Sequence, residues 1–212
     1  MSRYRHRLLL LLISTMFFIQ PAEAQQDMRF GLMVSPSISW FTANADDYAT
    51  DPSWRFTYGL MGDFFLTDRY AINTGFHIAS RGAKLQLADT MGTYSMSLIE
   101  IPIALKMRTQ QFDRMTYFAR FGGSLGFKTG EKVSLEPDRT EEKHLDNYFT
   151  PIQTQFMIGL GAEYEIDGSS AVVFGLDYVR GLNDALRDED VRVGKRDNYR
   201  LWGLQFTLGF FF

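Results

Sequence analysis

Large apolar side chains alternate with small or polar ones along most of the chain. Over residues 29–40 the even positions are apolar, from Phe30 to Trp40, and most odd positions are small or polar. A two-residue period places the apolar side chains on one face of a β-strand. The same alternation recurs over residues 54–66, 70–78, 99–107, 117–127, 152–164, 172–178 and 202–212. The sequence therefore predicts eight strands, each with one apolar face.

The connections between these strands alternate in length. Those at residues 67–69, 109–114 and 167–170 are tight, whereas the polar stretches 42–53, 82–93, 129–150 and 182–197 are long. Short turns at one rim and long loops at the other, with an even number of strands, are typical of outer-membrane barrels. We therefore expect an all-β fold, an eight-stranded antiparallel transmembrane β-barrel of the outer-membrane type, over residues 25–212. Tyr94, Met96 and Leu98 have the opposite parity from the apolar run at 99–107, which indicates a β-bulge near Leu98.

The apolar face is expected to point outward, into lipid. A soluble β-sandwich or a lipocalin-like barrel would turn this face inward, but its large aromatic side chains would crowd a narrow interior. Aromatic residues also gather near both ends of the strands, as in the interfacial girdles of membrane barrels. They are Phe64, Tyr70, Tyr117, Tyr164 and residues 210–212 near the short turns, and Trp40, Trp54, Tyr94, Tyr178 and Trp202 near the long loops.

The first residues have the pattern of a secretory signal. Arg3, Arg5 and Arg7 precede the apolar run at residues 8–19, and Ala22-Glu23-Ala24 follows as an A-x-A cleavage site. Twelve apolar residues are too few to span a bilayer as a helix. We expect residues 1–24 to be a cleaved signal peptide, so that the mature chain begins at Gln25.

Composition excludes several classes of function. The 212 residues include no cysteine, which excludes disulfides, thiol nucleophiles and Cys-ligated metals. The formal charge is −3, from 22 Lys+Arg and 25 Asp+Glu. Removal of the signal leaves 19 basic and 24 acidic residues, because three Arg and one Glu are lost. A slightly acidic chain is a poor candidate for binding nucleic acid, and nothing in it indicates a cofactor.

Residues 94–106 (YSMSLIEIPIALK) resemble the Tyr-Leu-Glu-Ile-Pro…Lys segment of the PorT-like outer-membrane β-barrel family of Bacteroidetes. Residues 117–126, 175–182 and 208–212 agree with the same family, although Ile99 stands where the segment usually has Leu. The resemblance spans the mature chain and implies the outer membrane of a diderm bacterium and an eight-stranded barrel. The member that gives the family its name is an accessory of type IX protein secretion and gliding motility.

The sequence offers few residues in arrangements that could support catalysis. Of the three histidines, His6 lies in the signal, His144 in a charged loop and His77 on the polar face of a predicted strand. A lipid-modifying hydrolase would need a Ser–His pair, but His77 and Ser80 are three residues apart and face opposite sides of a strand. We expect His77 to make a structural hydrogen bond, with Arg55 or Asp63 as partner. We expect no catalytic residue, cofactor site or metal site.

Ten charged side chains are expected in the lumen. A conducting pore and a salt-bridged plug are the two interpretations, and the plug is favoured because eight strands enclose room only for their own side chains. Glu100 is the best candidate to pair with Arg81, Lys106 or Arg120. The ten residues are Arg55, Asp63, Arg81, Glu100, Lys106, Arg120, Lys128, Glu163, Glu165 and Asp177.

The leading hypothesis is a non-enzymatic outer-membrane barrel that acts as an interaction or assembly component, with both termini in the periplasm. Its expected partners are outer-membrane lipid and proteins bound through the long extracellular loops or the periplasmic rim. The alternatives are a lipid-modifying enzyme and a narrow solute pore. We also expect the terminal aromatic Phe212 to be an assembly signal or part of the periplasmic girdle.

Overall fold

The computed structural model describes residues 28–42, 50–87, 90–136, 150–184 and 200–212. The predicted signal at residues 1–24, His144 and most of the charged long loops therefore lie outside the described residues. Within the described ranges no helix is long and apolar enough to cross a membrane. The strands are β1 Met28–Thr42, β2 Thr50–Asp51, β3 Ser53–Thr67, β4 Tyr70–Leu87, β5 Thr90–Arg108, β6 Met115–Glu136, β7 Ile152–Glu165, β8 Ala171–Gly181 and β9 Arg200–Phe211.

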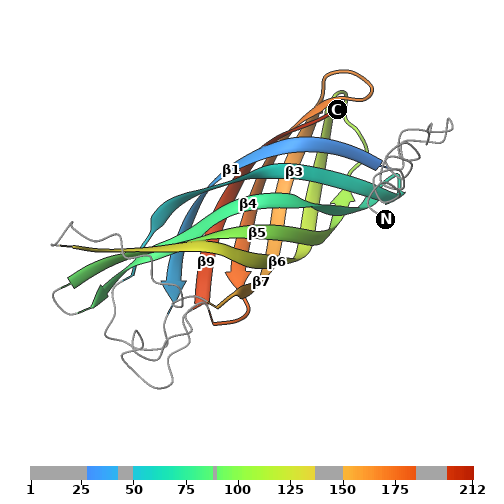
Figure 1. Ribbon diagram of the computed structural model, residues 1–212. Helices are drawn as coiled ribbons and strands as arrows, with labels where there is room; N and C mark the ends of the chain where they lie inside the picture. Colours follow the sequence, from blue (N-terminus) through green and yellow to red (C-terminus); the bar gives the residue numbers. More distant parts are fainter. Residues whose placement is uncertain (1–27, 43–49, 88–89, 137–149, 185–199) are drawn as a thin grey trace, which may run out of the picture.

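The eight long strands close into an antiparallel barrel (Figure 1). Consecutive strands pair as hairpins, and the sheet closes where β1 pairs with β9, from Gly31 opposite Phe211 to Thr42 opposite Arg200. At the short-turn rim the Phe212 N–H also donates to the Phe30 carbonyl, over 3.0 Å. The predicted eight-stranded antiparallel barrel is confirmed, and the two-residue β2 is added to it as an edge strand on β4.

The two faces of the barrel wall divide as the alternation predicts. The outer face is apolar and exposed, as for Leu160, which is 68% exposed, whereas the alternate positions turn inward and are buried, as for Ser35 at 0%. Phe211 is an exception to the predicted aromatic girdle at residues 210–212, because its ring points into the lumen and is 0% exposed. Met33 and Met61 are also buried inside, so the lumen contains apolar volume as well as charge.

The predicted long loop at residues 82–93 is wrong. β4 and β5 continue to pair through this stretch, from Gly82 opposite Ser95 to Leu87 opposite Thr90. β6 likewise extends to Glu136, into the predicted loop at 129–150. Beyond the hydrocarbon layer a strand needs no apolar outer face, so a polar sequence that reads as a loop can still form a ladder. These extensions run past the other strands at the lower left of Figure 1.

The predicted bulge near Leu98 is present, but the extra residue belongs to β6 and not to β5. The register between β5 and β6 shifts between Ser97 and Leu98, where Thr129 of β6 is left without a partner opposite it. The parity of β5 does not change, since Met96 and Leu98 are buried together with Glu100. Met96 and Leu98 therefore face the lumen, and β6 is the strand whose faces exchange.

Candidate functional site in the barrel lumen

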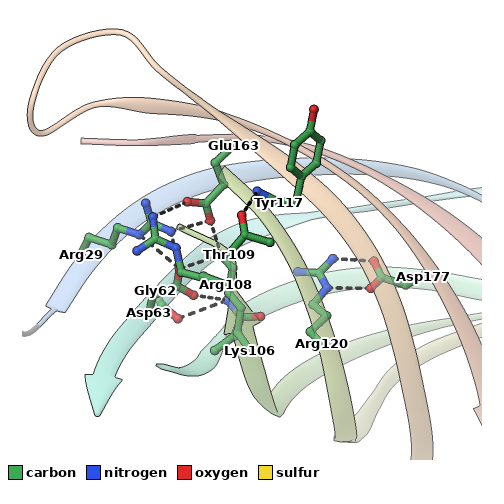
Figure 2. Close-up of polar contacts among 11 residues, drawn as sticks. Arg29, Gly62, Asp63, Lys106, Arg108, Thr109, Tyr117, Arg120, Glu163 and Asp177 are labelled. Carbon is green, nitrogen blue, oxygen red and sulfur yellow. Dashed lines mark hydrogen bonds and ion pairs between the residues drawn. The ribbon is translucent and has the colours of Figure 1, made fainter. Parts of the chain in front are cut away.

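Apart from the Lys128–Glu131 pair on β6, the ion-paired side chains of the lumen form three groups, and the largest lies near the short turns (Figure 2). Its members come from four strands, with Arg29 on β1, Asp63 on β3, Lys106 and Arg108 on β5, and Glu163 on β7. Arg29 Nη2 lies 2.8 Å from Asp63 and 2.5 Å from Glu163, and Lys106 Nζ lies 2.7 Å and 2.5 Å from the same two carboxylates. Arg108 Nη2 lies 3.0 Å from Glu163. Three cations thus share two carboxylates, and Asn73 Nδ2 donates a further hydrogen bond to Asp63 over 2.6 Å.

Aromatic rings enclose this cluster. The Arg29 guanidinium lies 4.0 Å from the centroid of Phe211, and Lys106 Nζ lies 4.4 Å from that of Phe118. The centroid of the Phe65 ring lies 5.3 Å from the guanidinium of Arg29 and 5.1 Å from that of Arg108. Cation–π contacts of this kind stabilise a positive charge where water is scarce. They account for a cluster that holds one more cation than carboxylates.

The second group is an ion pair in the middle of the lumen. Arg120 of β6 donates to Asp177 of β8 through both Nε, over 2.6 Å, and Nη2. The Thr207 hydroxyl lies 3.1 Å from Arg120 Nη2 and accepts its hydrogen bond. Gly159 makes room for this pair, because a Cβ there would lie 1.9 Å from Asp177 Oδ1. The close approach requires glycine at this position of β7.

The third group lies nearer the long-loop end. Arg81 of β4 donates to both carboxylate oxygens of Glu100 on β5, through Nε over 3.0 Å and Nη2 over 2.9 Å. Gln155 of β7 donates to the same carboxylate over 3.0 Å, and Gln205 of β9 accepts from Arg81 over 3.1 Å. Of the three partners that the sequence left open for Glu100, the structure selects Arg81. The arrangement ties four strands together across the lumen.

Eight of the ten lumen charges expected from sequence form ion pairs within the described residues. They are Asp63, Arg81, Glu100, Lys106, Arg120, Lys128, Glu163 and Asp177. Two cations of the network, Arg29 and Arg108, were not among the expected ten. Parity could have found them, because Arg108 shares the face of Glu100 and Lys106 on β5 and Arg29 shares that of Ser35 on β1.

The contact expected for His77 is not formed. His77 lies opposite Glu100 in the β4–β5 register, and its Nε2 atom has no hydrogen-bond partner among the described residues. It lines a cavity of about 30 Å³ together with Gln155, whose buried Oε1 also has no partner there. That volume corresponds to about one water molecule. Within the described part of the chain no three His, Asp or Glu side chains are grouped to hold a metal.

A second cavity, of about 610 Å³, lies at the short-turn mouth of the barrel. Arg29, Arg108 and Glu163 line its inner part, and residues of the β3–β4 and β7–β8 turns line its rim. Lys106, which is 1% exposed, lies on the lumen side of these residues, with both carboxylates of the cluster bound to it. The paired charges therefore fill the barrel directly behind this mouth.

Comparison with known proteins bears on the fold. Residues 20–187 match the family described as "Outer membrane protein beta-barrel domain". A search of curated protein sequences gives no match.

Solved structures of similar shape include three outer-membrane proteins. The outer membrane protein OprG from Pseudomonas aeruginosa is 9% identical, with a TM-score of 0.49 over 87% of this chain and 94% of that one. Neisserial surface protein A is 9% identical, with a TM-score of 0.47, and the match covers 85% of this chain and 95% of that one. The attachment invasion locus protein Ail of Yersinia pestis, in complex with the heparin analogue sucrose octasulfate, is 11% identical, with a TM-score of 0.43. The match covers 88% of this chain and 99% of that one.

Proposed function

The chain belongs to the family of outer membrane protein beta-barrel domains, and we propose that it is a non-enzymatic interaction or assembly component of the outer membrane. Membership and the closed barrel with its apolar exterior establish an outer-membrane barrel. The family and the fold leave the role to be argued from the particular features of this chain. Two of them favour interaction over transport.

The first feature is the filled lumen. Three ion-paired groups cross it at successive levels, and Asp63, Lys106 and Asp177 are each at most 1% exposed. An eight-stranded barrel has little space inside beyond its own side chains, and here that space is occupied by bonded charges. Transport through the lumen would require the carboxylates and cations to separate within a largely desolvated interior, at a cost of several kcal/mol per pair.

The second feature, which carries the proposal, is a projecting sheet at the long-loop end. We use this name for β2 with the outer parts of β4, β5 and β6. β6 pairs with β7 only as far as Phe127 opposite Ile152, yet it continues to pair with β5 as far as Glu136 opposite Met91. The sheet thus extends beyond the barrel wall (Figure 1), and in the proposed role its edge meets partner proteins outside the membrane. Edges of this kind are used for strand addition by partner proteins.

The proposed orientation places the short turns and both termini in the periplasm and the projecting sheet outside the cell. Barrels of this class carry short periplasmic turns and longer extracellular loops. The resemblance of β5 to the PorT-like segment adds the finer proposal that the chain belongs to that group from Bacteroidetes and assists protein secretion of the type IX or gliding kind. Glu100 of that segment is the residue that binds Arg81.

Copurification from detergent-solubilised outer membrane tests the proposal. The informative variant replaces residues 83–94 with Asn-Gly, a two-residue hairpin turn that joins Gly82 to its strand partner Ser95 and leaves the barrel wall intact. The unaltered chain should retain specific partners, with secretion components among them, and the trimmed variant should lose them. Gln205→Ala, inside the lumen, is the matched control and should retain them. Equal recovery from the trimmed variant would overturn a role for the projecting sheet.

A further inference from the structure

Two arginines stand on the outer wall of the barrel at its long-loop end. Arg180 is the penultimate residue of β8 and Arg200 is the first residue of β9. Their neighbours turn inward, since Val179 lines the lumen cavity and Leu201 is buried. Of the outward-facing positions described on β7, β8, β9 and β1, only these two carry a charge.

Aromatic side chains lie beside Arg180 on the same outer face. Its guanidinium lies 4.6 Å from the ring centroid of Trp202, and Tyr178 meets Trp202 edge to face with centroids 5.7 Å apart. The strand registers place Arg180, Trp202 and Trp40 side by side across β8, β9 and β1. Trp54 of β3 lies opposite Ile38 in the next row, so all three tryptophans of the chain are on three adjacent strands. The patch formed by Tyr178, Arg180, Arg200, Trp202 and Trp40 is called the outer aromatic-arginine patch below.

Among the described residues, the two arginines differ from four arginines of the lumen in having no carboxylate partner. Arg29, Arg81, Arg108 and Arg120 each pair with an Asp or Glu. Arg180 has only its stack on Trp202 and Arg200 has no ion pair or hydrogen bond within the described ranges. Tryptophan and tyrosine at a barrel rim mark the level of the lipid headgroups, where phosphate is the abundant anion.

We infer that the outer aromatic-arginine patch binds the phosphate of a lipid headgroup in the leaflet next to the long loops. Arginine matches phosphate through paired N–H donors, and the Trp202 ring holds the Arg180 guanidinium in one orientation before the lipid arrives. The lipid chains then lie along the apolar wall of β8, β9 and β1. The identity of the leaflet rests on the orientation in the proposed function. In that orientation the leaflet is the outer one, and the ligand is a phosphorylated glycolipid.

The competing interpretation is that both arginines extend to water and select no lipid. Native mass spectrometry of the purified full chain in detergent separates the two. The probes are a synthetic diphosphorylated glucosamine-disaccharide lipid, its dephosphorylated form and inorganic phosphate. We expect the phosphorylated lipid to bind and the dephosphorylated form to bind at least about tenfold more weakly, because the two guanidinium–phosphate contacts are lost.

Variants assign the binding to the patch. Arg180→Gln and Arg200→Gln should each weaken binding of the phosphorylated lipid about fivefold, the usual effect of one basic residue at a charged lipid surface, and the double variant about 25-fold. Lys132→Gln, which removes an exposed cation from β6 away from the patch, should leave it unchanged. Slower gel mobility after boiling than before confirms that each variant retains the closed barrel.

Three results would overturn the inference. They are equal binding of the two lipid forms, unchanged binding by the double variant, and binding of inorganic phosphate with displacement of the lipid at equal concentration, which would identify a free-phosphate site. None of these results depends on partner proteins or on a function of the projecting sheet. Failure here and failure of the proposed function are therefore distinguishable.

Discussion

The substitution Asp63→Asn changes the charge balance of the largest lumen cluster with almost no change in shape. Asp63 is completely buried and accepts hydrogen bonds from Arg29, Lys106 and Asn73. Its loss leaves Glu163 as the one carboxylate for three cations. Removing one partner of a buried ion pair costs about 3–5 kcal/mol. Because Arg29 and Lys106 each keep Glu163, we expect a loss near the lower limit, about 3 kcal/mol of the free energy of unfolding.

The other members of the network give graded expectations. Asp177→Asn removes the sole carboxylate that pairs with Arg120 in the described structure, so its cost should lie near the upper limit, about 5 kcal/mol. Lys106→Met leaves two arginines with two carboxylates, and each carboxylate keeps an arginine. Its cost should therefore be about 1–2 kcal/mol, set by the lost hydrogen bonds.

Urea titration of the barrel in detergent micelles, followed by the fraction that keeps its unheated gel mobility, measures these differences. Asp68→Asn in the exposed β3–β4 turn is the matched control and should cost almost nothing. In the double variant of Asp63→Asn with Lys106→Met, the second change removes an excess cation, so the double variant should be less destabilised than the sum of the two. Equal stability of the Asp63 and Asp68 variants, or strict additivity in the double variant, would refute the network.

Three further outcomes are expected. Phe206→Arg places a charge in the lipid-facing wall and should cost about 2–4 kcal/mol of insertion stability. Gln205→Ala loses one lumen hydrogen bond and should cost about 1 kcal/mol. The yields of the two variants on refolding into lipid vesicles compare these costs. Gly159→Ala should destabilise the barrel by about 1–3 kcal/mol in the same urea titration, because its Cβ has no room. The Asp167 carboxyl accepts the backbone N–H of Ser170 in the β7–β8 turn, which lowers its pKa. An NMR titration should show this, and the turn should keep that stabilisation above the ordinary Asp pKa and lose it as the pH falls through the lowered value.

The sequence predicted the fold because lipid imposes one simple condition on every strand. A side chain that meets the hydrocarbon must be apolar, so Phe206 and Gln205 reveal their faces by identity alone. The number of strands and the antiparallel closure follow from counting such runs. Where that condition is absent the pattern fails. The polar stretch at 82–93 read as a loop although it forms a hairpin, and Met96 and Leu98 read as lipid-facing although they fill the lumen.

The partners within the lumen could not be predicted because they depend on the stagger between strands. Glu100 and Arg81 are not opposite each other in the β4–β5 register, where Glu100 pairs with His77 and Arg81 pairs with Met96. Their long side chains meet diagonally, a relation that alternation does not encode. The cluster around Glu163 likewise joins four strands whose mutual offset appears only once the barrel is closed.

Conductance across a planar lipid bilayer shows whether paired charges close the lumen. The purified barrel, inserted at neutral pH in the presence of a small monovalent salt, should give no steady current step. The ions would have to pass the cluster of Arg29, Lys106 and Glu163, whose charges are bonded to one another. Stable, reproducible conductance steps from the unaltered protein would contradict a filled lumen and favour the narrow solute pore.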